Sequence, residues 1–432
     1  MKARKTIMNN CELYESKVRS YSRSFPCVFH KAKGSFMYSE SGEEYIDFFD
    51  GAGALNYGHN NDFIKSRVIE YLENDGMIHA LDMFTTAKND FLEEYYKCVL
   101  SKLGADYKVM FCGPTGTNAN EAALKLARKV TGRETVFAFT GSFHGMTLGS
   151  LSVTSGLDIR KGAGLQLNNV VFMPYGVGSN FNFDTLDYME NLLNDDHSGI
   201  EKPAAVIFET VQAEGGINVA EIEWLQRLEK ICEKHGILTI CDEVQVGCGR
   251  TGAFYSFERA GLHPDMISSS KSIGGYGFPM AILLIKDQYD IWSPGEHNGT
   301  FRGNQVAFIA AKAALEYREK YDLASEVKRK SAIIEEYLKN EIIPIDDRLT
   351  YRGIGMIWGI DFAQIDPSGE LTHRIASKCF DNKLIIERAG RHDVVLKIMP
   401  ALTIEDDVLL KGLASIKKSI IDILIILFIS NS

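Results

Sequence analysis

Between residues 109 and 241 the chain alternates short apolar runs with longer segments of helical periodicity. The apolar runs lie at 109–112, 136–139, 170–173, 205–209 and 237–241, and helix-like segments lie at 120–130 and 222–234. Consecutive strands joined through helices pair in parallel, because the crossover returns the chain to the same end of the sheet. This alternation predicts an α/β fold with a mostly parallel sheet and helices on both faces.

The remainder of the chain predicts a smaller α+β domain beside that sheet. Runs at 34–38 and 44–49 indicate a hairpin, and helical segments at 308–320 and 324–339 are followed by a strand at 356–362. A chain of 432 residues with 45% hydrophobic content can bury a large core and a second, smaller one. We expect an N-terminal segment at 1–65 that joins the small domain, a large domain at 66–320 and a C-terminal small domain at 321–432.

Charge and cysteine content exclude several classes of protein. The formal net charge of -10 disfavours nucleic-acid binding, which requires clustered lysine and arginine. Eight cysteines are scattered without the spacing of a zinc site or a disulfide framework. We therefore expect no metal and reduced thiols in a cytoplasmic protein.

The two ends of the chain give no sign of a membrane anchor. Residues 1–24 are charged and polar and lack the apolar core of a secretion signal. Residues 420–429 are strongly apolar, but they form roughly half of the ~20 residues that cross a bilayer. We interpret them as the end of a packed helix or an unusual tail, and expect no membrane partner.

Two charged residues follow neighbouring strands of the expected sheet. Asp242 follows the run at 237–241, and Lys271 lies just past the strand-like run at 264–270. Ligands of open parallel sheets bind at the carboxyl ends of the strands, so both residues belong to the region where a site forms. A lysine that forms a Schiff base and an acid that keeps a pyridine nitrogen protonated are the groups that pyridoxal 5'-phosphate requires.

Each of these residues taken singly has a simpler interpretation. Asp242 could be a helix cap or half of a structural ion pair, and Lys271 in its Ser/Gly-rich loop could be a solvated surface residue. The ordered occurrence of further site-like residues after other strands favours the cofactor. Desolvation would lower the pKa of Lys271 toward the neutral amine that attacks an aldehyde.

Three further segments supply groups that suit the rest of such a cofactor. The turn at 111–119 feeds a helix, and its free backbone N–H groups at Gly116 and Thr117 suit a phosphate; an ordinary N-cap is the alternative. Phe143 could stack on a planar ring, although a phenylalanine taken alone is more often a buried core residue. Gln245 could donate to the phenolic oxygen of the ring, or be a surface amide.

These residues together resemble the class-III aminotransferases of pyridoxal phosphate fold type I. The likeness extends over nearly the whole chain, in the segments 47–48, 58–59, 115–119, 143–145, 209–215, 240–252, 271 and 299–304. It implies the cofactor roles given above and adds that Lys271 carries the proton between substrate and cofactor. It also implies that Thr300 reaches the phosphate of a neighbouring subunit's cofactor, hence at least a homodimer, and that Glu214 alternates between substrates as a gate acid.

Three departures from the usual family pattern concern substrate binding. Met146 stands where many members have an arginine that grips a carboxylate, and Arg302 stands where a glycine is usual. Our hypothesis is that Arg302 takes over that carboxylate contact; the alternative is a solvated arginine. Lys397 replaces the arginine that commonly pairs with the gate acid, and a lysine is a point charge where an arginine is a fork. Gating by Glu214 therefore need not follow the family in detail.

With these departures the chain is most similar to members acting on L-2,4-diaminobutyrate and 2-oxoglutarate. The resemblance implies exchange of the terminal amino group, giving L-aspartate 4-semialdehyde and L-glutamate, with the reverse direction serving ectoine synthesis. A rival interpretation is another ω-amino donor such as ornithine, acetylornithine or 4-aminobutyrate. A decarboxylase or aminomutase on the same scaffold is a second rival, and a binding protein that no longer reacts is a third.

Overall fold

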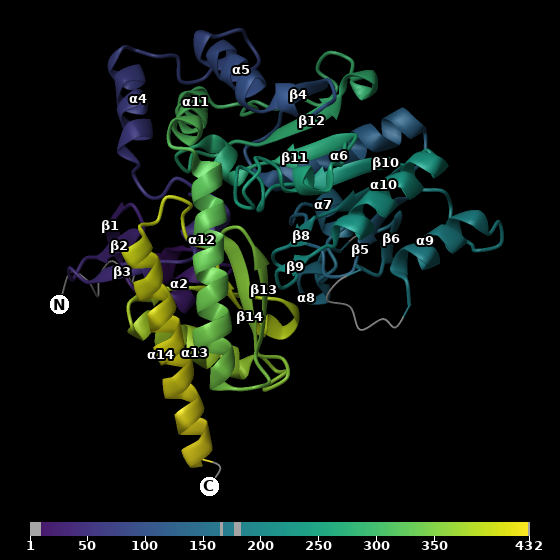
Figure 1. Ribbon diagram of the computed structural model, residues 1–432. Helices are drawn as coiled ribbons and strands as arrows, with labels where there is room; N and C mark the ends of the chain where they lie inside the picture. Colours follow the sequence, from purple (N-terminus) through teal and green to yellow (C-terminus); the bar gives the residue numbers. More distant parts are fainter. Residues whose placement is uncertain (1–9, 165–166, 177–182, 431–432) are drawn as a thin grey trace.

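The computed structural model describes residues 10–164, 167–176 and 183–430, and its centre is a seven-stranded sheet (Figure 1). In spatial order the strands are β4 (Tyr107–Phe111), β12 (Ile282–Lys286), β11 (Met266–Ser269), β10 (Leu238–Asp242), β7 (Ala205–Phe208), β5 (Val136–Phe139) and β6 (Val170–Met173). Strand β12 pairs antiparallel with both neighbours, and the other adjacent pairs are parallel. The prediction of a mostly parallel sheet is confirmed.

The central strands are apolar throughout because both faces of the sheet are covered. Every residue of β5 and β7 is buried. Along β5, Phe137 and Phe139 point into one hydrophobic cluster while Val136 and Ala138 point into another. Successive side chains of a strand point to opposite faces, so two separate cores require a continuous apolar run rather than an alternating one.

Helices cover the two faces through apolar stripes. Helix α6 (Gly116–Thr131) packs its buried alanines and leucines on the face that Val136 occupies, and α10 (Ile222–His235) packs Leu225 and Leu228 on the other. Gly236 ends α10 in the left-handed conformation, φ 57°. Because glycine adopts that conformation without strain, the helix stops there and β10 begins directly afterwards.

The N-terminal segment forms its own small sheet. Strands β1 (Phe29–Lys33), β2 (Phe36–Ser39) and β3 (Glu44–Asp47) are antiparallel, and β15 (Leu384–Ile385) pairs with β3 in parallel. The predicted hairpin is confirmed. Further elements of the N-terminal region include α2 (Tyr21–Ser24), α3 (Asp50–Gly53), α4 (Asp62–Glu73) and α5 (Thr86–Cys98).

The C-terminal region is a second layer of sheet and helices. Its sheet has the order β13 (Thr350–Ile354), β14 (Ile357–Asp361), β17 (Val395–Ile398) and β16 (Glu387–Ala389). The helices packed with it are α12 (Leu323–Tyr337), α13 (Glu370–Asp381) and α14 (Asp406–Ser430). Helix α11 (Gln305–Lys320) contributes buried residues to this core and to the core of the large sheet. The predicted helices are confirmed, and α11 and α12 each begin at a side-chain cap, from Asn304 and Asp322.

The apolar C-terminal run is the end of a long helix. In Figure 1, α14 extends away from the rest of the molecule toward the C-terminus. Ile420, Ile423 and Leu424 are buried in the C-terminal core, whereas Ile425 and Ile426 are each 51% exposed. Within the described residues no helix has both the length and the apolar character needed to cross a membrane.

Short helices and strands lie in the connections between the strands of the large sheet. They are α7 (Leu148–Ser152), α8 (Leu157–Arg160), α9 (Thr185–Asn194), β8 (Val211–Gln212) and β9 (Asn218–Val219).

Candidate active site

The predicted lysine and aspartate meet at the carboxyl edge of the large sheet. Asp242 is the last residue of β10, and the neighbouring parallel strand β11 ends two residues before Lys271. A pocket of about 380 Å³ opens between them. Of the predicted site residues, those that line it are Gly116, Thr117, Phe143, Glu214, Asp242, Gln245 and Lys271. These residues lie far apart in the sequence, and their positions at or just after strand ends place them at one edge of the sheet.

Asp242 is buried and held on both carboxylate oxygens. His144 Nδ1 lies 2.7 Å from Oδ2, and Asn120 Nδ2 donates to the same oxygen at 2.8 Å. The backbone N–H of Val244 donates to Oδ1 at 3.0 Å. These bonds fix the direction of the carboxylate. Among the described residues His144 Nε2 has no hydrogen-bond partner.

Lys271 follows β11 in the left-handed region, φ 52°, with its side chain directed to the pocket. Within the described part of the chain its Nζ makes no hydrogen bond or ion pair. Burial lowers the pKa of Lys271 from 10.5 to about 8, and the nearby Glu214 carboxylate opposes that shift. The neutral, nucleophilic amine is therefore accessible near neutral pH.

The first two residues of α6, Gly116 and Thr117, line the pocket. Thr115 occupies the N-cap position with an extended backbone, and its hydroxyl donates to the Asn118 side chain at 2.9 Å instead of accepting from a backbone N–H of the helix. A side chain at position 116 has no room, because a Cβ there would lie 2.7 Å from Val244 Cγ1. The first N–H groups of a long helix, approached closely through glycine, suit a phosphate.

Phe143 and Gln245 line the same pocket: the ring of Phe143 is partly exposed, whereas the amide of Gln245 is hydrogen-bonded on both hydrogens. Phe143 is 38% exposed, so its ring is available for stacking instead of being part of the core. Gln245 Nε2 donates to Ala52 O at 3.0 Å and to Glu214 Oε1 at 2.9 Å. Both hydrogens of the amide are engaged there, so a bond from Gln245 to a ring oxygen stays a prediction.

Glu214 and Lys397 form the ion pair that the sequence suggested. Lys397 lies on β17 with a fully buried side chain, and its Nζ is 2.7 Å from Glu214 Oε1. Against the effect of burial, the lysine lowers the pKa of Glu214 to about 2. Lys397 is also 2.8 Å from Glu387 Oε2, and the two carboxylates overcome burial to raise the pKa of the lysine. The expected gate acid is therefore held by a lysine with two acidic partners.

Four residues of the site were missed or left unassigned by sequence reasoning. Glu209 follows β7, lines the pocket and accepts the Phe143 N–H at 3.1 Å; burial, then the charge of Asp242, raises its pKa well above the usual range. Its place after a strand was a usable signal. Asn120, Tyr21 and Glu387 carry no such local signal, because they come from a helix interior, the N-terminal segment and the smaller sheet.

Thr300 and Arg302 lie outside this pocket. Thr300 is exposed, and Arg302 Nη1 donates to Asn298 Oδ1 at 3.2 Å in the same loop. The role expected for Thr300 involves a neighbouring subunit. Both roles therefore stay predictions.

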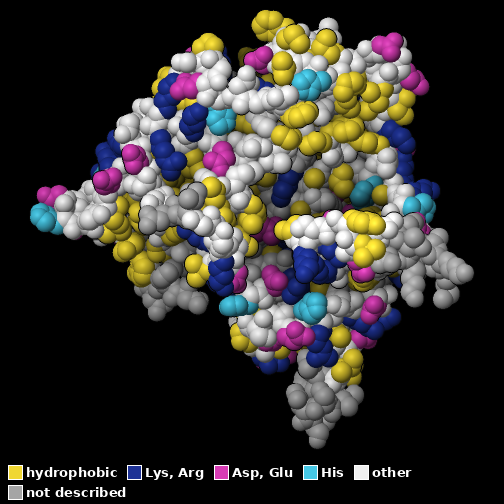
Figure 2. All heavy atoms as spheres, turned by 180° about the vertical axis from the view of Figure 1, so that it is seen from behind, with side chains coloured by type: hydrophobic (Ala, Val, Ile, Leu, Met, Phe, Trp, Pro, Cys, Tyr) yellow, Lys and Arg dark blue, Asp and Glu magenta, His cyan; other side chains and the backbone are white. Residues whose placement is uncertain are grey.

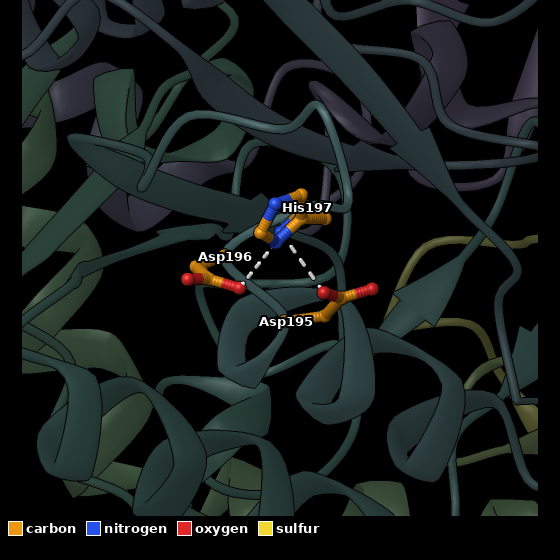
Figure 3. A group of neighbouring side chains, drawn as sticks. All are labelled: Asp195, Asp196 and His197. Carbon is orange, nitrogen blue, oxygen red and sulfur yellow. Dashed lines mark hydrogen bonds and ion pairs between the residues drawn. The ribbon is translucent and has the colours of Figure 1, made fainter.

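One surface cluster has the composition of a metal site. Asp195, Asp196 and His197 follow α9, and their ligand atoms lie within 4.8 Å of one another (Figure 3). His197 Nδ1 lies 2.7 Å from Asp196 Oδ1, and its backbone N–H donates to Asp195 at 2.9 Å. All three side chains are exposed and none lines the pocket, so the cluster takes no part in the site.

The pocket's residues fit pyridoxal phosphate. The uncapped helix start with its obligatory glycine suits the phosphate, the oriented carboxylate suits the pyridine nitrogen, and the unpaired lysine amine suits the aldehyde. Phe143 supplies an exposed aromatic face for the ring. Lys271 lines this pocket and is not a solvated surface lysine, whereas Asp242 does pair with His144, so the roles of these residues toward the cofactor stay predictions.

Solved structures with the same architecture are enzymes of one class. An aminotransferase of Bacillus anthracis has a TM-score of 0.87 at 21% identity, covering 97% of this chain and 99% of that one. The ornithine aminotransferase of Toxoplasma gondii ME49 has a TM-score of 0.84 at 24% identity, covering 98% and 96%. At these identities the likeness establishes the fold, and the expected fold type I is confirmed.

Sequence comparison extends the likeness to the family. A protein of Halalkalibacterium halodurans named diaminobutyrate–2-oxoglutarate transaminase is 53% identical over 416 residues, covering 96% of both chains. A protein of the same name from Bordetella parapertussis is 50% identical over 412 residues, covering 95% of this chain and 94% of its own. Residues 18–420 match the family described as aminotransferase class-III, and with these near-full-length relatives the match shows that the chain belongs to the class-III aminotransferases.

Proposed function

We propose that this protein is a pyridoxal phosphate-dependent aminotransferase that exchanges the terminal amino group of L-2,4-diaminobutyrate with 2-oxoglutarate. The products are L-aspartate 4-semialdehyde and L-glutamate. The observation that carries the proposal is the unpaired amine of Lys271 beside the fixed carboxylate of Asp242 in one pocket. Relatives about half identical over nearly their full length, which bear the corresponding name, support this choice of substrates.

In this proposal Asp242, His144 and Lys271 have separate roles at the pyridine ring of the cofactor. When bound, the cofactor supplies an aldehyde that takes up the amino group and a ring that withdraws electrons. Asp242 would hold a proton on the pyridine nitrogen, and His144 fixes the direction of the carboxylate. Lys271 would hold the cofactor through its aldehyde and, once released by the donor, would carry the proton between substrate and cofactor; a pKa of about 8 suits both tasks at neutral pH.

The substrate end of the pocket is assigned to Glu214 and Lys397. Glu214 lines the pocket and is bonded to both Gln245 and Lys397, so it can meet an ammonium group of a donor in this position. Movement of Glu214 away from Lys397 would take one of the two carboxylates off the lysine and so reduce the negative charge that a carboxylate of the acceptor meets. Arg302 is proposed as a further carboxylate contact, supported by its place in the loop that also holds Thr300.

A donor screen tests the function. Purified enzyme with cofactor and 2-oxoglutarate is offered L-2,4-diaminobutyrate, ornithine, acetylornithine and 4-aminobutyrate, and glutamate formation is measured. The highest kcat/KM is expected for L-2,4-diaminobutyrate, and L-glutamate with L-aspartate 4-semialdehyde should react in reverse. Carbon dioxide release, or a shifted amino group without glutamate, would point instead to a decarboxylase or an aminomutase.

We further propose a homodimer or higher homo-oligomer with shared active sites. In support, exposed apolar side chains gather at Met77, Ile78, Leu81, Met83 and Phe84 between α4 and α5. Figure 2 shows hydrophobic side chains grouped over that upper part of the molecule. Thr300 would then reach the cofactor phosphate of the neighbouring subunit.

The cellular compartment, the pathway and the division into domains are also proposals. All eight cysteines are free, which supports a reducing cytoplasm, and the reverse reaction would supply ectoine synthesis. The division into residues 1–65, 66–320 and 321–432 is supported by the hydrophobic clusters. Two clusters cover the faces of the large sheet, and a third joins residues such as Phe48 and Ile64 to the C-terminal helices.

A further inference from the structure

The buried cation at the substrate end of the pocket has more acid around it than it can neutralise. Lys397 has a fully buried side chain, with Glu214 Oε1 at 2.7 Å and Glu387 Oε2 at 2.8 Å. Glu387 is itself mostly buried, with 15% of its side chain exposed. With both carboxylates ionised, the one lysine between them leaves one negative charge in surplus, in a region where water screens it poorly. Burial raises the pKa of Glu387, and the charge of Lys397 opposes that shift.

This surplus charge lies against the pocket wall. Tyr21 lines the pocket and donates from its hydroxyl to Glu387 Oε1 at 3.2 Å, while Glu214 lines the pocket directly. Both carboxylates also act on the reacting amine, because each raises the pKa of Lys271 against burial, while Lys397 between them lowers it. Their field therefore reaches the place where a donor must react.

The remaining described groups of the pocket do not cancel the surplus. Among the described lining residues, Lys271 is the only lysine or arginine, and its amine is the one that the cofactor takes. Glu209 lines the pocket too, but burial raises its pKa well above the usual range, which favours its neutral form. The pair of carboxylates on Lys397 thus sets the sign of the field at the substrate end.

We propose that Glu387 determines donor specificity: with Glu214 it leaves a net negative charge on Lys397 that selects amino donors carrying a second ammonium group. This inference rests on the proposed function and refines it. L-2,4-diaminobutyrate has a net charge of about +1 at neutral pH, and 4-aminobutyrate, the same molecule without its α-ammonium, has none. The acceptor 2-oxoglutarate is a dianion, which the same charge opposes.

Glu387 acts on the substrate through the field and through Lys397. It does not line the pocket, so it is a positioning and specificity residue and not a catalytic one. Glu214 can move with each substrate, whereas Glu387 belongs to β16 and pairs across the sheet with Lys397 on β17. A fixed second carboxylate keeps the buried lysine compensated when Glu214 departs.

The substitution Glu387→Gln tests the charge with little change of shape. Glutamine keeps a carbonyl oxygen that can accept from the Tyr21 hydroxyl. The donor and acceptor half-reactions are measured separately by the absorbance of the loaded enzyme. The ratio of kcat/KM for L-2,4-diaminobutyrate over 4-aminobutyrate is expected to fall on the order of tenfold, while kcat/KM for 2-oxoglutarate does not fall.

Two controls separate charge from structure. Glu387→Asp keeps the charge and should keep the donor ratio. Glu341→Gln removes a surface carboxylate, half exposed and paired with Lys417, and should change nothing. If the glutamine protein does not fold, Glu387→Met is the second neutral variant. An unchanged donor ratio, or an equal loss for all three substrates, would overturn the inference.

Dissociation constants of the donors, measured at equilibrium, test the charge effect on binding without any contribution from reaction rates. In a Lys271→Ala background the loaded protein is titrated with each donor by calorimetry, with and without Glu387→Gln. The ratio of dissociation constants should change by the same factor. Failure of the proposed function looks different, because the wild-type enzyme would then not turn over L-2,4-diaminobutyrate at all.

Discussion

His144 Nδ1 lies 2.7 Å from Asp242 Oδ2, and both side chains are buried at the carboxyl edge of the sheet. A carboxylate at that place is costly unless donors meet it, and this one has His144, Asn120 and a backbone N–H. The ring nitrogen of the cofactor would complete the set. His144 is therefore a positioning residue for the acid.

Removal of His144 should slow the reaction by loosening Asp242. We expect His144→Ala to lower kcat by about 10- to 100-fold, since a hydrogen bond to a charged group contributes about 1.5–3 kcal/mol. His144→Asn retains a donor near the Nδ1 position and should lose less. Steady-state kinetics with the visible spectrum of the bound cofactor measure both effects. Equal losses in the two variants would show that the hydrogen bond is not what matters.

The lowered pKa of Lys271 gives the attachment of cofactor a defined pH dependence. Burial disfavours the ammonium form, so the pKa falls from 10.5 to about 8 and the neutral amine increases as pH rises through about 8. Only the neutral amine attacks an aldehyde. The rate of covalent attachment to cofactor-free protein, followed by stopped-flow absorbance, should rise about tenfold per pH unit below about pH 8 and level off above it. A rate still rising about tenfold per unit at about pH 9.5 would contradict the shift.

Gly116→Ala should weaken cofactor binding through one steric contact. The new Cβ would lie 2.7 Å from Val244 Cγ1, and overpacking of this kind costs about 1–3 kcal/mol. The dissociation constant for the cofactor, measured by fluorescence quenching, should rise by about tenfold or more. Adding Val244→Ala removes the opposing methyl groups and should restore part of the affinity. No recovery in the double variant would mean that the glycine serves another purpose.

Arg250 should stabilise the fold more than a surface arginine does. Its fully buried guanidinium forms an ion pair with Asp50 and donates to Met356 O at 3.1 Å, so it joins the N-terminal segment to the C-terminal region. Arg250→Ala leaves a buried carboxylate unpaired, and we expect a loss of about 3–5 kcal/mol in the free energy of unfolding. Arg329→Ala, which breaks the exposed pair with Asp406, should have little effect in the same denaturant titration.

The proposed subunit interface predicts that a charge at Phe84 lowers the molecular mass of the particle in solution, because the oligomer dissociates. Phe84 is fully exposed in the single chain, and a charge there would be buried against a second copy. Phe84→Asp should shift the protein toward monomer in sedimentation velocity, with loss of activity because Thr300 no longer reaches the neighbouring site. Tyr188→Asp, on α9 at the far side of the molecule, is the matched control. A wild-type monomer with full activity would refute the shared site.

Local pattern determined the elements and much of the cofactor site. The run at 136–139 is apolar because both of its faces are buried, and Gly236 ends its helix because glycine alone adopts that backbone without strain. Asp242 ends a strand, Lys271 follows one and Gly116 opens the helix after another, so the rule that ligands bind at the carboxyl ends of parallel strands sufficed to group them.

Only the tertiary structure decided which distant groups complete that site. Tyr21 and Glu387 are separated by 366 positions in the sequence, yet one donates to the other at the pocket wall. Such contacts depend on how the N-terminal segment and the smaller sheet dock on the large sheet, and docking depends on packing that no local periodicity encodes. The second acid on Lys397 is for the same reason visible only in three dimensions.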